Sequence, residues 1–481
     1  MKHIFLRICT VLSLMLSMPL MAWSDDASSA NKLFVAAVKA WNEADTQSTE
    51  DFSSLSIKDD RLSEVEAMLQ RIIDENSGSD LALKLITGDK IGPISLESVK
   101  SSRQNLNRKI IVARCHSAPS QSCLFEASLN YASKLDEYSR NEVLGDIARK
   151  YGEAKIEKSA ISTLRTIDPS MVSDHLFLDL GSILNNDNLL TEAFQHALKA
   201  DTGQRNNRFE SISTAMFKQG MTEEANNVLM LIDEPIYRDS TLSKRVEILA
   251  SRGEVDAAVS LANSIESHIF RSGAFGEIAK AQARQGNLKE SLATAQNIED
   301  DYARYFAAIQ IGKAMNDKEM IEASIDAILE AGDLLGDIAL EDGVIALLDM
   351  GLTSDALTTT YKAKGFRREA LLALIASSLA RKGDTAQAKK IASHLKDFNE
   401  FDYFLNNLAT AQAKSGSVEN ALSTVRRMSS DYDQTIAKCD VAEAIAANGD
   451  IEKALKIMIS IDIEMPCIGT TLAAMAVGAA K

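Results

Sequence analysis

The chain has 481 residues, of which 46% are hydrophobic and only 5% aromatic, and its formal net charge is −16. This acidic balance argues against nucleic acid and anionic membrane surfaces as partners, because both require a basic protein surface. The length normally indicates about two or three globular domains, but a repeat protein can grow without one central core.

The N-terminus has the features of a cleavable signal peptide. Lys2 and Arg7 form a basic start, and residues 11–22 form a mostly apolar run followed by small residues. We therefore predict cleavage before Asp25 and export to the periplasm or beyond. Removal of the two basic residues changes the formal charge from −16 to −18. A retained membrane anchor needs about 20 apolar residues, whereas this run is shorter and interrupted by Pro19.

The region 25–137 lacks the period described below, and we interpret it as a helical cap. A solenoid needs such a cap because stacking leaves the apolar face of its end repeat uncovered. The pattern predicts helices over Asn31–Ala44, Leu62–Glu75 and Ser95–Ala113, a flexible start over Asp25–Ala30, a polar linker over Asp45–Asp59 and a turn over Gly88–Pro93.

Cys115 and Cys123 flank a polar loop in this region. In an oxidising compartment the pair predicts a local disulfide. The alternative is a metal site shared with His116, but a closed zinc site needs four ligands and only three candidates are nearby.

A ladder of glycines follows at nearly constant spacing. Successive members are separated by 33, 33, 65, 32, 33 and 33 residues, and the step of 65 is two periods with Asn316-Asp317 in the missing turn. Gly152 and the polar run 185–188 continue the series toward the N-terminus. The spacing predicts about ten repeats of roughly 33 residues. The ladder consists of Gly220, Gly253, Gly286, Gly351, Gly383, Gly416 and Gly449.

Each repeat is expected to be a helix–turn–helix unit with helices of about 12 to 15 residues. The glycine ends the first helix in a left-handed conformation, and the next residue is often a helix N-cap. Asn287 with Glu290 and Asp384 with Gln387 resemble capping boxes. Five residues after the glycine stands a small residue that permits close packing, and twelve after it stands a larger apolar one. The small residues are Ala225, Ala258, Ser291, Ala356, Ala388, Ala421 and Ala454, and the larger ones are Ile232, Ile265, Ile298, Leu395, Met428 and Ile461.

This pattern resembles the tetratricopeptide repeat. Gly383-Asp384 with Ala388 and Gly449-Asp450 with Ala454 are the best matches, and the resemblance covers residues 138–467. It implies an α-solenoid that binds partners in a concave groove. The sequence departs from that family where an aromatic usually stands four residues before the turn, since these places hold Leu249, Gln282, Leu379, Gln412 and Ile445. The fold class predicted here is therefore all-α: a signal peptide over 1–24, a cap over 25–137, and a tetratricopeptide-like solenoid over 138–481 that ends in a capping helix, Ile468–Ala480.

Two side-chain sets in the solenoid allow more than one interpretation. Cys439 and Cys467 are either a disulfide that ties the last repeat to the final helix or two buried thiols. Arg238, Arg271 and Arg304 lie 33 residues apart. They form either a basic stripe for an anionic ligand or a structural set that pairs with acidic residues placed five positions earlier, namely Asp233, Glu266 and Glu299.

The sequence holds no motif that predicts a cofactor, a metal site or a catalytic nucleophile. Glu97-Ser98 resembles the catalytic Glu-Ser pair of lytic transglycosylases, but no lysozyme-like domain follows it. The histidines are scattered without metal-ligand spacing. We therefore expect no enzyme activity and no cofactor.

Three functions stay open on these grounds. The first is a binding scaffold for a protein or peptide of the cell envelope. The second is a structural part of an envelope polysaccharide or outer-membrane assembly, and the third is a glycan-active enzyme. A peptide binder should expose polar and aromatic side chains along its concave helices. A structural part should expose an apolar patch on an edge, and an enzyme should gather carboxylates in a cleft.

Overall fold

The computed structural model describes residues 25–48, 51–116, 118–168, 174–331, 336–363, 366–396, 398–462 and 465–479. Over these residues the chain forms 26 helices, α2 to α27, and its only extended pairing is an isolated bridge between Ile91 and Ile94. The predicted all-α solenoid class is confirmed. The predicted signal peptide lies outside the described residues. Among the described helices, none has the length and apolar character needed to cross a membrane.

The chain divides into two compact units, which are described separately. Unit 1 combines the N-terminal segment up to Asp136 with the C-terminal segment Gly449–Lys481, and unit 2 is Glu137–Asn448.

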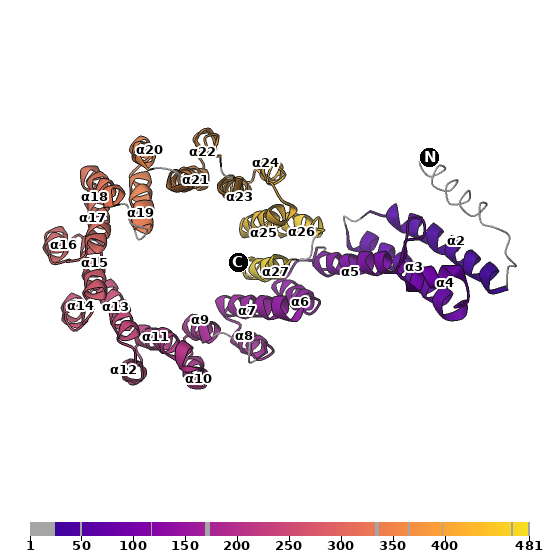
Figure 1. The fold of residues 1–481 in the computed structure, drawn as a ribbon, viewed down its shortest axis with the longest axis horizontal. Coiled ribbons are helices and arrows are strands. Elements are labelled where there is room, and N and C mark those ends of the chain that lie inside the picture. Colours follow the sequence, from indigo (N-terminus) through magenta and orange to yellow (C-terminus); the bar gives the residue numbers. More distant parts are fainter. Residues whose placement is uncertain are drawn as a thin grey trace. The chain divides into compact units, whose positions relative to one another are not determined.

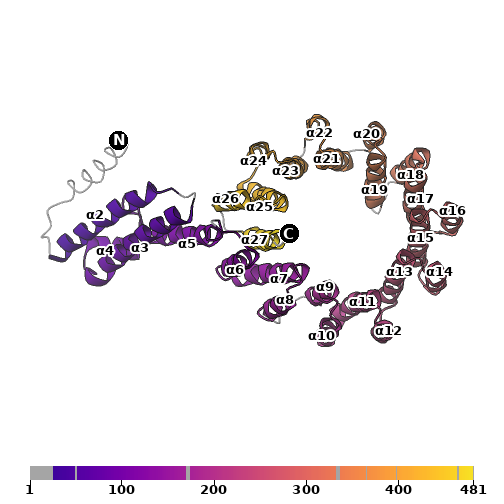
Figure 2. The same ribbon diagram turned by 180° about the vertical axis from the view of Figure 1, so that it is seen from behind.

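Unit 2 is a curved double layer of helices. Figures 1 and 2 both show the first helix of each repeat on the inner side of the curve and the second helix on the outer side. The inner helices are α7 (Glu137–Glu153), α9 (Asp174–Leu184), α11 (Thr202–Lys218), α13 (Pro235–Ser251), α15 (His268–Arg284), α17 (Asp301–Met315), α19 (Gly336–Asp349), α21 (Phe366–Arg381), α23 (Phe398–Lys414) and α25 (Asp431–Ala447). The outer helices are α8 (Glu157–Leu164), α10 (Asp187–Ala197), α12 (Thr222–Met230), α14 (Val255–Ala262), α16 (Leu288–Ala295), α18 (Lys318–Ala331), α20 (Thr353–Lys362), α22 (Thr385–Ala392) and α24 (Val418–Val425).

The turns between inner and outer helices carry the predicted left-handed residues. All seven glycines of the ladder have φ between 79° and 91°, and Asn316 has φ 56°. Asn185 also has a positive φ, of 53°. Glycine adopts this conformation without a Cβ clash, and asparagine tolerates it better than most residues.

The assignment of Gly152 to this series was wrong. Gly152 lies inside α7, and Lys155 is the left-handed residue of that turn, with φ 62°. A Cβ on Gly152 would stand 3.1 Å from Ile183 Cγ2 and 3.3 Å from Leu180 Cδ2. The glycine therefore serves close packing of α7 on α9 rather than chain reversal.

The small residues five positions after the turns pack as predicted. All seven of them, from Ala225 to Ala454, are fully buried. The helix lengths differ from the prediction, because most outer helices have only 8 or 9 residues and most inner helices have 14 to 17. The larger apolar residues therefore lie beyond the outer helix. Ile265, for example, is 1% exposed in the linker that follows α14.

The capping boxes are only partly present. The Asp384 side chain accepts a hydrogen bond from the backbone N–H of Gln387 at 3.1 Å. Asn287 is the N-cap of α16 but its side chain makes no capping bond, so that predicted box was wrong.

Unit 1 begins with a helical region that is more continuous than predicted. Residues 25–30 belong to the first helix, and most of the expected polar linker is helical because α3 starts at Phe52 behind its N-cap, Asp51. Leu55 is fully buried in that stretch and continues the apolar spacing of α3. The helices of this unit are α2 (Asp25–Asp45), α3 (Phe52–Glu75), α4 (Asp80–Ile86), α5 (Leu96–Ala113), α6 (Gln121–Ala132), α26 (Ile451–Ile459) and α27 (Pro466–Gly478).

Both ends of the sequence meet in unit 1. The C-terminal helix α27 packs on α6, where the Ser128 hydroxyl donates to the carbonyl oxygen of Gly469 at 2.7 Å. The Tyr131 hydroxyl lies 3.4 Å from the Met465 carbonyl oxygen. Lys109 Nζ on α5 lies 2.5 Å from Asp462 Oδ1. The apolar final helix is thus covered by residues more than 300 positions earlier in the sequence.

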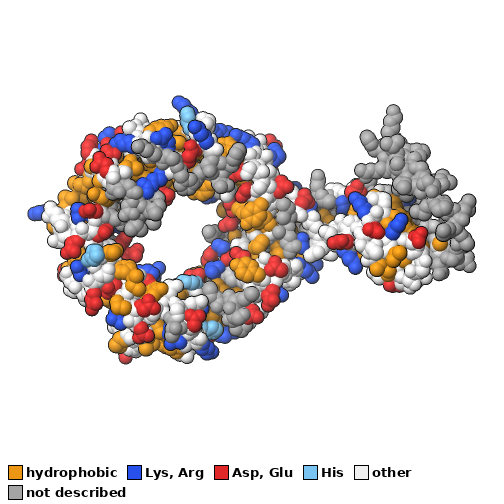
Figure 3. Space-filling model, in the orientation of Figure 1, with side chains coloured by type: hydrophobic (Ala, Val, Ile, Leu, Met, Phe, Trp, Pro, Cys, Tyr) orange, Lys and Arg blue, Asp and Glu red, His pale blue; other side chains and the backbone are white. Residues whose placement is uncertain are grey.

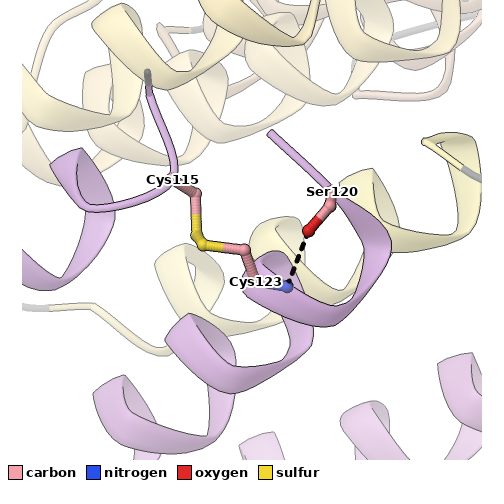
Figure 4. Close-up of a disulfide and its surroundings, with 3 residues drawn as sticks. All are labelled: Cys115, Ser120 and Cys123. Atoms are coloured by element: carbon pink, nitrogen blue, oxygen red, sulfur yellow. Dashed lines mark hydrogen bonds between the residues drawn. A yellow bond between two sulfur atoms is a disulfide. The ribbon is translucent and has the colours of Figure 1, made fainter. Parts of the chain in front are cut away.

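The predicted disulfide between Cys115 and Cys123 is present (Figure 4). It joins the end of α5 to the start of α6, where Ser120 is the N-cap and its hydroxyl accepts from the Cys123 N–H at 3.2 Å. The bond fixes the connection that leads into the helix on which α27 packs.

Candidate binding surface

The inner helices of unit 2 expose positions that differ from repeat to repeat. The position occupied by Ser211 in α11 recurs every 33 residues as a lysine, a glutamate and a glutamine: Lys244, Glu277 and Gln310. The position of Thr214 recurs as Glu247, Lys280 and Lys313. All eight side chains are at least partly exposed. The buried small positions of the same repeats hold only alanine or serine. The packing of the repeat is therefore constant while the chemistry of its inner face varies.

Many inner-face charges pair with a neighbouring inner helix. Arg149 on α7 bonds Asp179 on α9 at 2.9 Å. Asp349 on α19 accepts from Lys313 on α17 at 2.7 Å and from Lys382, in the turn after α21, at 3.0 Å. The two lysines hold the pKa of Asp349 below its ordinary value through these hydrogen bonds. Such exposed pairs contribute little each, but they keep the inner surface polar and ordered. Figure 3 shows acidic, basic and hydrophobic side chains interspersed over the visible face.

Two inner-face carboxyl groups are partly withdrawn from water. Burial raises the pKa of Asp342 on α19, although Lys280 and Lys313 act in the opposite direction. Burial also raises the pKa of Asp440 on α25, and the Asn406 side chain, which donates to it at 2.7 Å, partly offsets this effect. Raised carboxyl pKa values occur at functional sites and also in structural networks.

The predicted arginine stripe holds the linkers between repeats. Arg238 donates to the carbonyl oxygen of Ile232 at 2.8 Å, and Arg271 donates to that of Ile265 at 3.0 Å. Arg304 bonds the Ile298 carbonyl oxygen at 3.1 Å. The main acceptors are thus the last carbonyl groups of the preceding repeat, which lack helical partners, and not the acidic side chains that the second of the two interpretations proposed.

A complementary set of side chains, which the sequence analysis missed, bonds the next linker. Each member directly follows an arginine of this period, which also includes Arg205, whose guanidinium donates to the Ala200 carbonyl oxygen at 2.8 Å. Asn206 follows Arg205 and accepts from the Asp233 N–H at 3.0 Å, and Asp239 accepts from the Ser267 N–H at 2.8 Å. The sequence did contain a signal for this set, because a polar residue follows each of these arginines at the period of the repeat.

Arg245 is a second residue that the sequence analysis missed. It is 3% exposed and lies under the inner surface, at the position that neighbouring repeats fill with Ile212, Ile278 and Ile311. Its guanidinium donates to Ser213 Oγ and to the Ala225 carbonyl oxygen, both at 2.7 Å. Burial lowers the pKa of Arg245 to about 10, so the group stays charged at neutral pH.

One edge of unit 2 exposes apolar side chains at equivalent places. The second residue is exposed in four inner helices: Tyr138 in α7 (71%), Ile236 in α13 (59%), Ile269 in α15 (59%) and Tyr432 in α25 (60%). Leu198 and Leu231, the C-cap residues of α10 and α12, are also exposed at the start of the linkers that lead to the following inner helices.

Comparisons with known proteins identify no family. No protein-family model matches the chain, and no curated protein matches its sequence. A solved structure, that of Ton1535 from Thermococcus onnurineus NA1, is similar at 15% identity over 68% of this chain and 96% of that chain, with a TM-score of 0.23. At that TM-score the likeness supports no conclusion about fold or function.

The remaining predicted residues have structural surroundings. Cys439 is buried in α25 and Cys467 lies in α27, and their pairing stays a prediction. Ser98 of the Glu97-Ser98 pair takes part in a capping box with Ser95 at the start of α5. In the described part of the chain, no group of three or more His, Cys, Asp or Glu side chains could hold a metal ion.

Proposed function

We propose that this chain is an exported, tetratricopeptide-like repeat protein that binds a protein or peptide partner along the inner face of unit 2, and that it acts without catalysis as a scaffold in the cell envelope. The observation that carries the proposal is the contrast between constant packing positions and varied inner-face positions. A repeat array with this division has a fixed backbone and a modular surface whose side chains select the partner.

An exposed aromatic side chain within an inner helix adds support. Tyr403 on α23 is 50% exposed. Aromatic side chains contribute much contact area at small entropic cost, which is why interfaces are enriched in them. The disulfide between Cys115 and Cys123 accords with export to an oxidising compartment.

A second candidate, a structural part of an envelope polysaccharide or outer-membrane assembly, is favoured by the apolar edge. Ile236 and Ile269 occupy the same place in neighbouring helices and expose most of their surface. Exposed apolar side chains at equivalent places in adjacent repeats are typical of a surface that another protein covers.

Affinity capture tests both candidates. Tagged mature protein is retained from its own envelope fraction after mild crosslinking, and the co-purifying material is identified by mass spectrometry. We expect one protein partner at near-equal stoichiometry. Retention of a glycan or small molecule with no protein partner would contradict the proposal and favour a glycan-active enzyme.

A further inference from the structure

A cavity of about 410 Å³ lies between α7, α9 and the linker before α9, beside the edge of unit 2 where Tyr138 is exposed. Its floor is apolar, because Ile167 and Leu176 line it and each is only 4% exposed. Gly145 lines the same space, and a Cβ there would stand 3.5 Å from Leu176 Cδ2. The absence of a side chain at Gly145 therefore keeps the cavity open on the α7 side.

The mouth of the cavity carries an aromatic ring and negative charge. Tyr138 and Glu142 line it from successive turns of α7, and both are exposed. Glu142 makes no ion pair with any described residue. Asp146 lines the next part of the wall, and its partner Arg149, at 2.7 Å, is shared with Asp179. Among the lining residues, Glu142 and Asp146 carry two negative charges and Arg149 carries one positive charge, which it shares with Asp179 outside the lining.

From this combination we infer that the cavity binds a lysine or arginine side chain of the peptide partner, an inference that rests on the proposed function. The apolar floor accommodates the methylene groups of such a side chain, which pack well on apolar surface while the charged end stays near water. The Tyr138 ring attracts a cation near its face, and the carboxylates at the mouth pair with the ammonium or guanidinium group. An acidic side chain would meet like charge at the same place.

The probes for a test are Nα-acetyl-lysine N-methylamide and its arginine counterpart, with Nα-acetyl-norleucine N-methylamide as an uncharged control of similar shape. Binding to the full mature protein is measured by ligand-observed NMR. We expect the cationic probes to bind at least roughly tenfold more tightly than the norleucine probe, a difference that one charged contact supplies. Equal binding of the three probes would overturn the inference.

Variants locate the binding. E142Q with D146N should weaken binding of the cationic probes about tenfold, whereas the matched control E223Q with E224Q, on the outer helix α12, should leave it unchanged. G145L fills the cavity without altering charge and should abolish binding, so the test does not depend on the charge variant alone. Unchanged binding in a folded G145L variant, or equal losses in the charge variant and the control, would contradict the site.

The outcome is separable from that of the proposed function. Capture of the same envelope partner by wild type and by folded G145L, with equal yield, would refute the role of the cavity and leave the scaffold proposal intact. Capture of no partner by the wild type would refute the scaffold proposal whatever the probes show.

Discussion

Arg245 places a guanidinium group in a core position that other repeats fill with isoleucine. Its hydrogen bonds to Ser213 and Ala225 are short, and its carbon Cζ lies 4.8 Å from the centroid of the Phe217 ring. No carboxylate partner of Arg245 is present among the described residues. A buried charge held only by neutral groups costs desolvation energy that the repeat does not need for packing.

R245I should therefore raise the free energy of unfolding, by about 1 to 4 kcal/mol on the scale of comparable replacements. R245A should lower it by about 3 kcal/mol, because it removes the same hydrogen bonds and also leaves a cavity. Denaturant unfolding of both variants measures whether each change raises or lowers the free energy of unfolding. A loss of stability in R245I as large as that in R245A would show that the arginine is required for the fold.

Asp440 gives a prediction about pH. Burial raises the pKa of this carboxyl in the folded state. The contribution of the carboxyl to the free energy of unfolding is therefore fully present below its unfolded-state pKa of about 3.9, and it is lost as the pH rises through the folded-state pKa. D440N is uncharged at every pH and should raise the melting temperature at pH 7 more than at pH 4. E247Q removes an exposed carboxylate on α13 and serves as the control, with no difference at either pH. A larger gain for D440N at pH 4 would contradict the assignment.

At the scale of elements, the turn of each repeat was predictable because glycine has a distinct backbone preference. The ladder from Gly220 to Gly449 therefore located the turns correctly. Where other residues take the left-handed conformation, as Lys155 does, composition gives no such signal and the nearby Gly152 was misleading. Helix lengths were less predictable. The apolar residue after each outer helix is buried in a linker, but its spacing from the preceding apolar residues also fits a helix, so the outer helices were predicted to be too long.

Two glycine variants test this account of the turn. Gly383 has φ 90° and open space around it, so G383A should cost about 1 to 2 kcal/mol for backbone conformation alone. Gly273 lies within α15, also with open space, so G273A should stabilise by roughly 1 kcal/mol through helix propensity. Thermal unfolding compares them, and changes of the same sign would be inconsistent with the assigned conformations.

The disulfide contributes at the same scale. Its two cysteines are separated by 8 positions in the sequence. Closing so short a loop stabilises the folded state by roughly 2 to 3 kcal/mol in the chain-entropy account. The double variant C115A with C123S should lose about that much in denaturant unfolding of unit 1. Reduction of the wild type is the control and should lower the free energy of unfolding equally. No loss of stability in either experiment would refute the contribution of the disulfide.

At the scale of the whole molecule, the all-helical repeat architecture followed from the periodicity alone. The composition of unit 1 did not, because the bond between Ser128 and Gly469 joins residues 341 positions apart. No local pattern in the sequence indicates which distant helix covers α27. The sequence predicted that an inner face exists but not which residues form it, because the exposed positions of the first helices could be identified only once their burial was known.

The central claim is that the inner face of unit 2 binds the partner. Three substitutions on the inner helices, E247K and R284E at exposed positions and Q310K at a half-buried one, change the charge pattern and leave the packing residues intact. Three on the outer helices and the linker after α16, E224K, K289E and Q296K, are the matched control.

The most direct measurement is the amount of partner that each protein captures from the envelope fraction relative to the wild type. The account predicts at least a roughly tenfold loss for the inner-face variant, which corresponds to about 1.4 kcal/mol, and unchanged capture for the outer-face control. Full capture by the inner-face variant, with loss in the control, would contradict it and would place the binding surface on the outer layer.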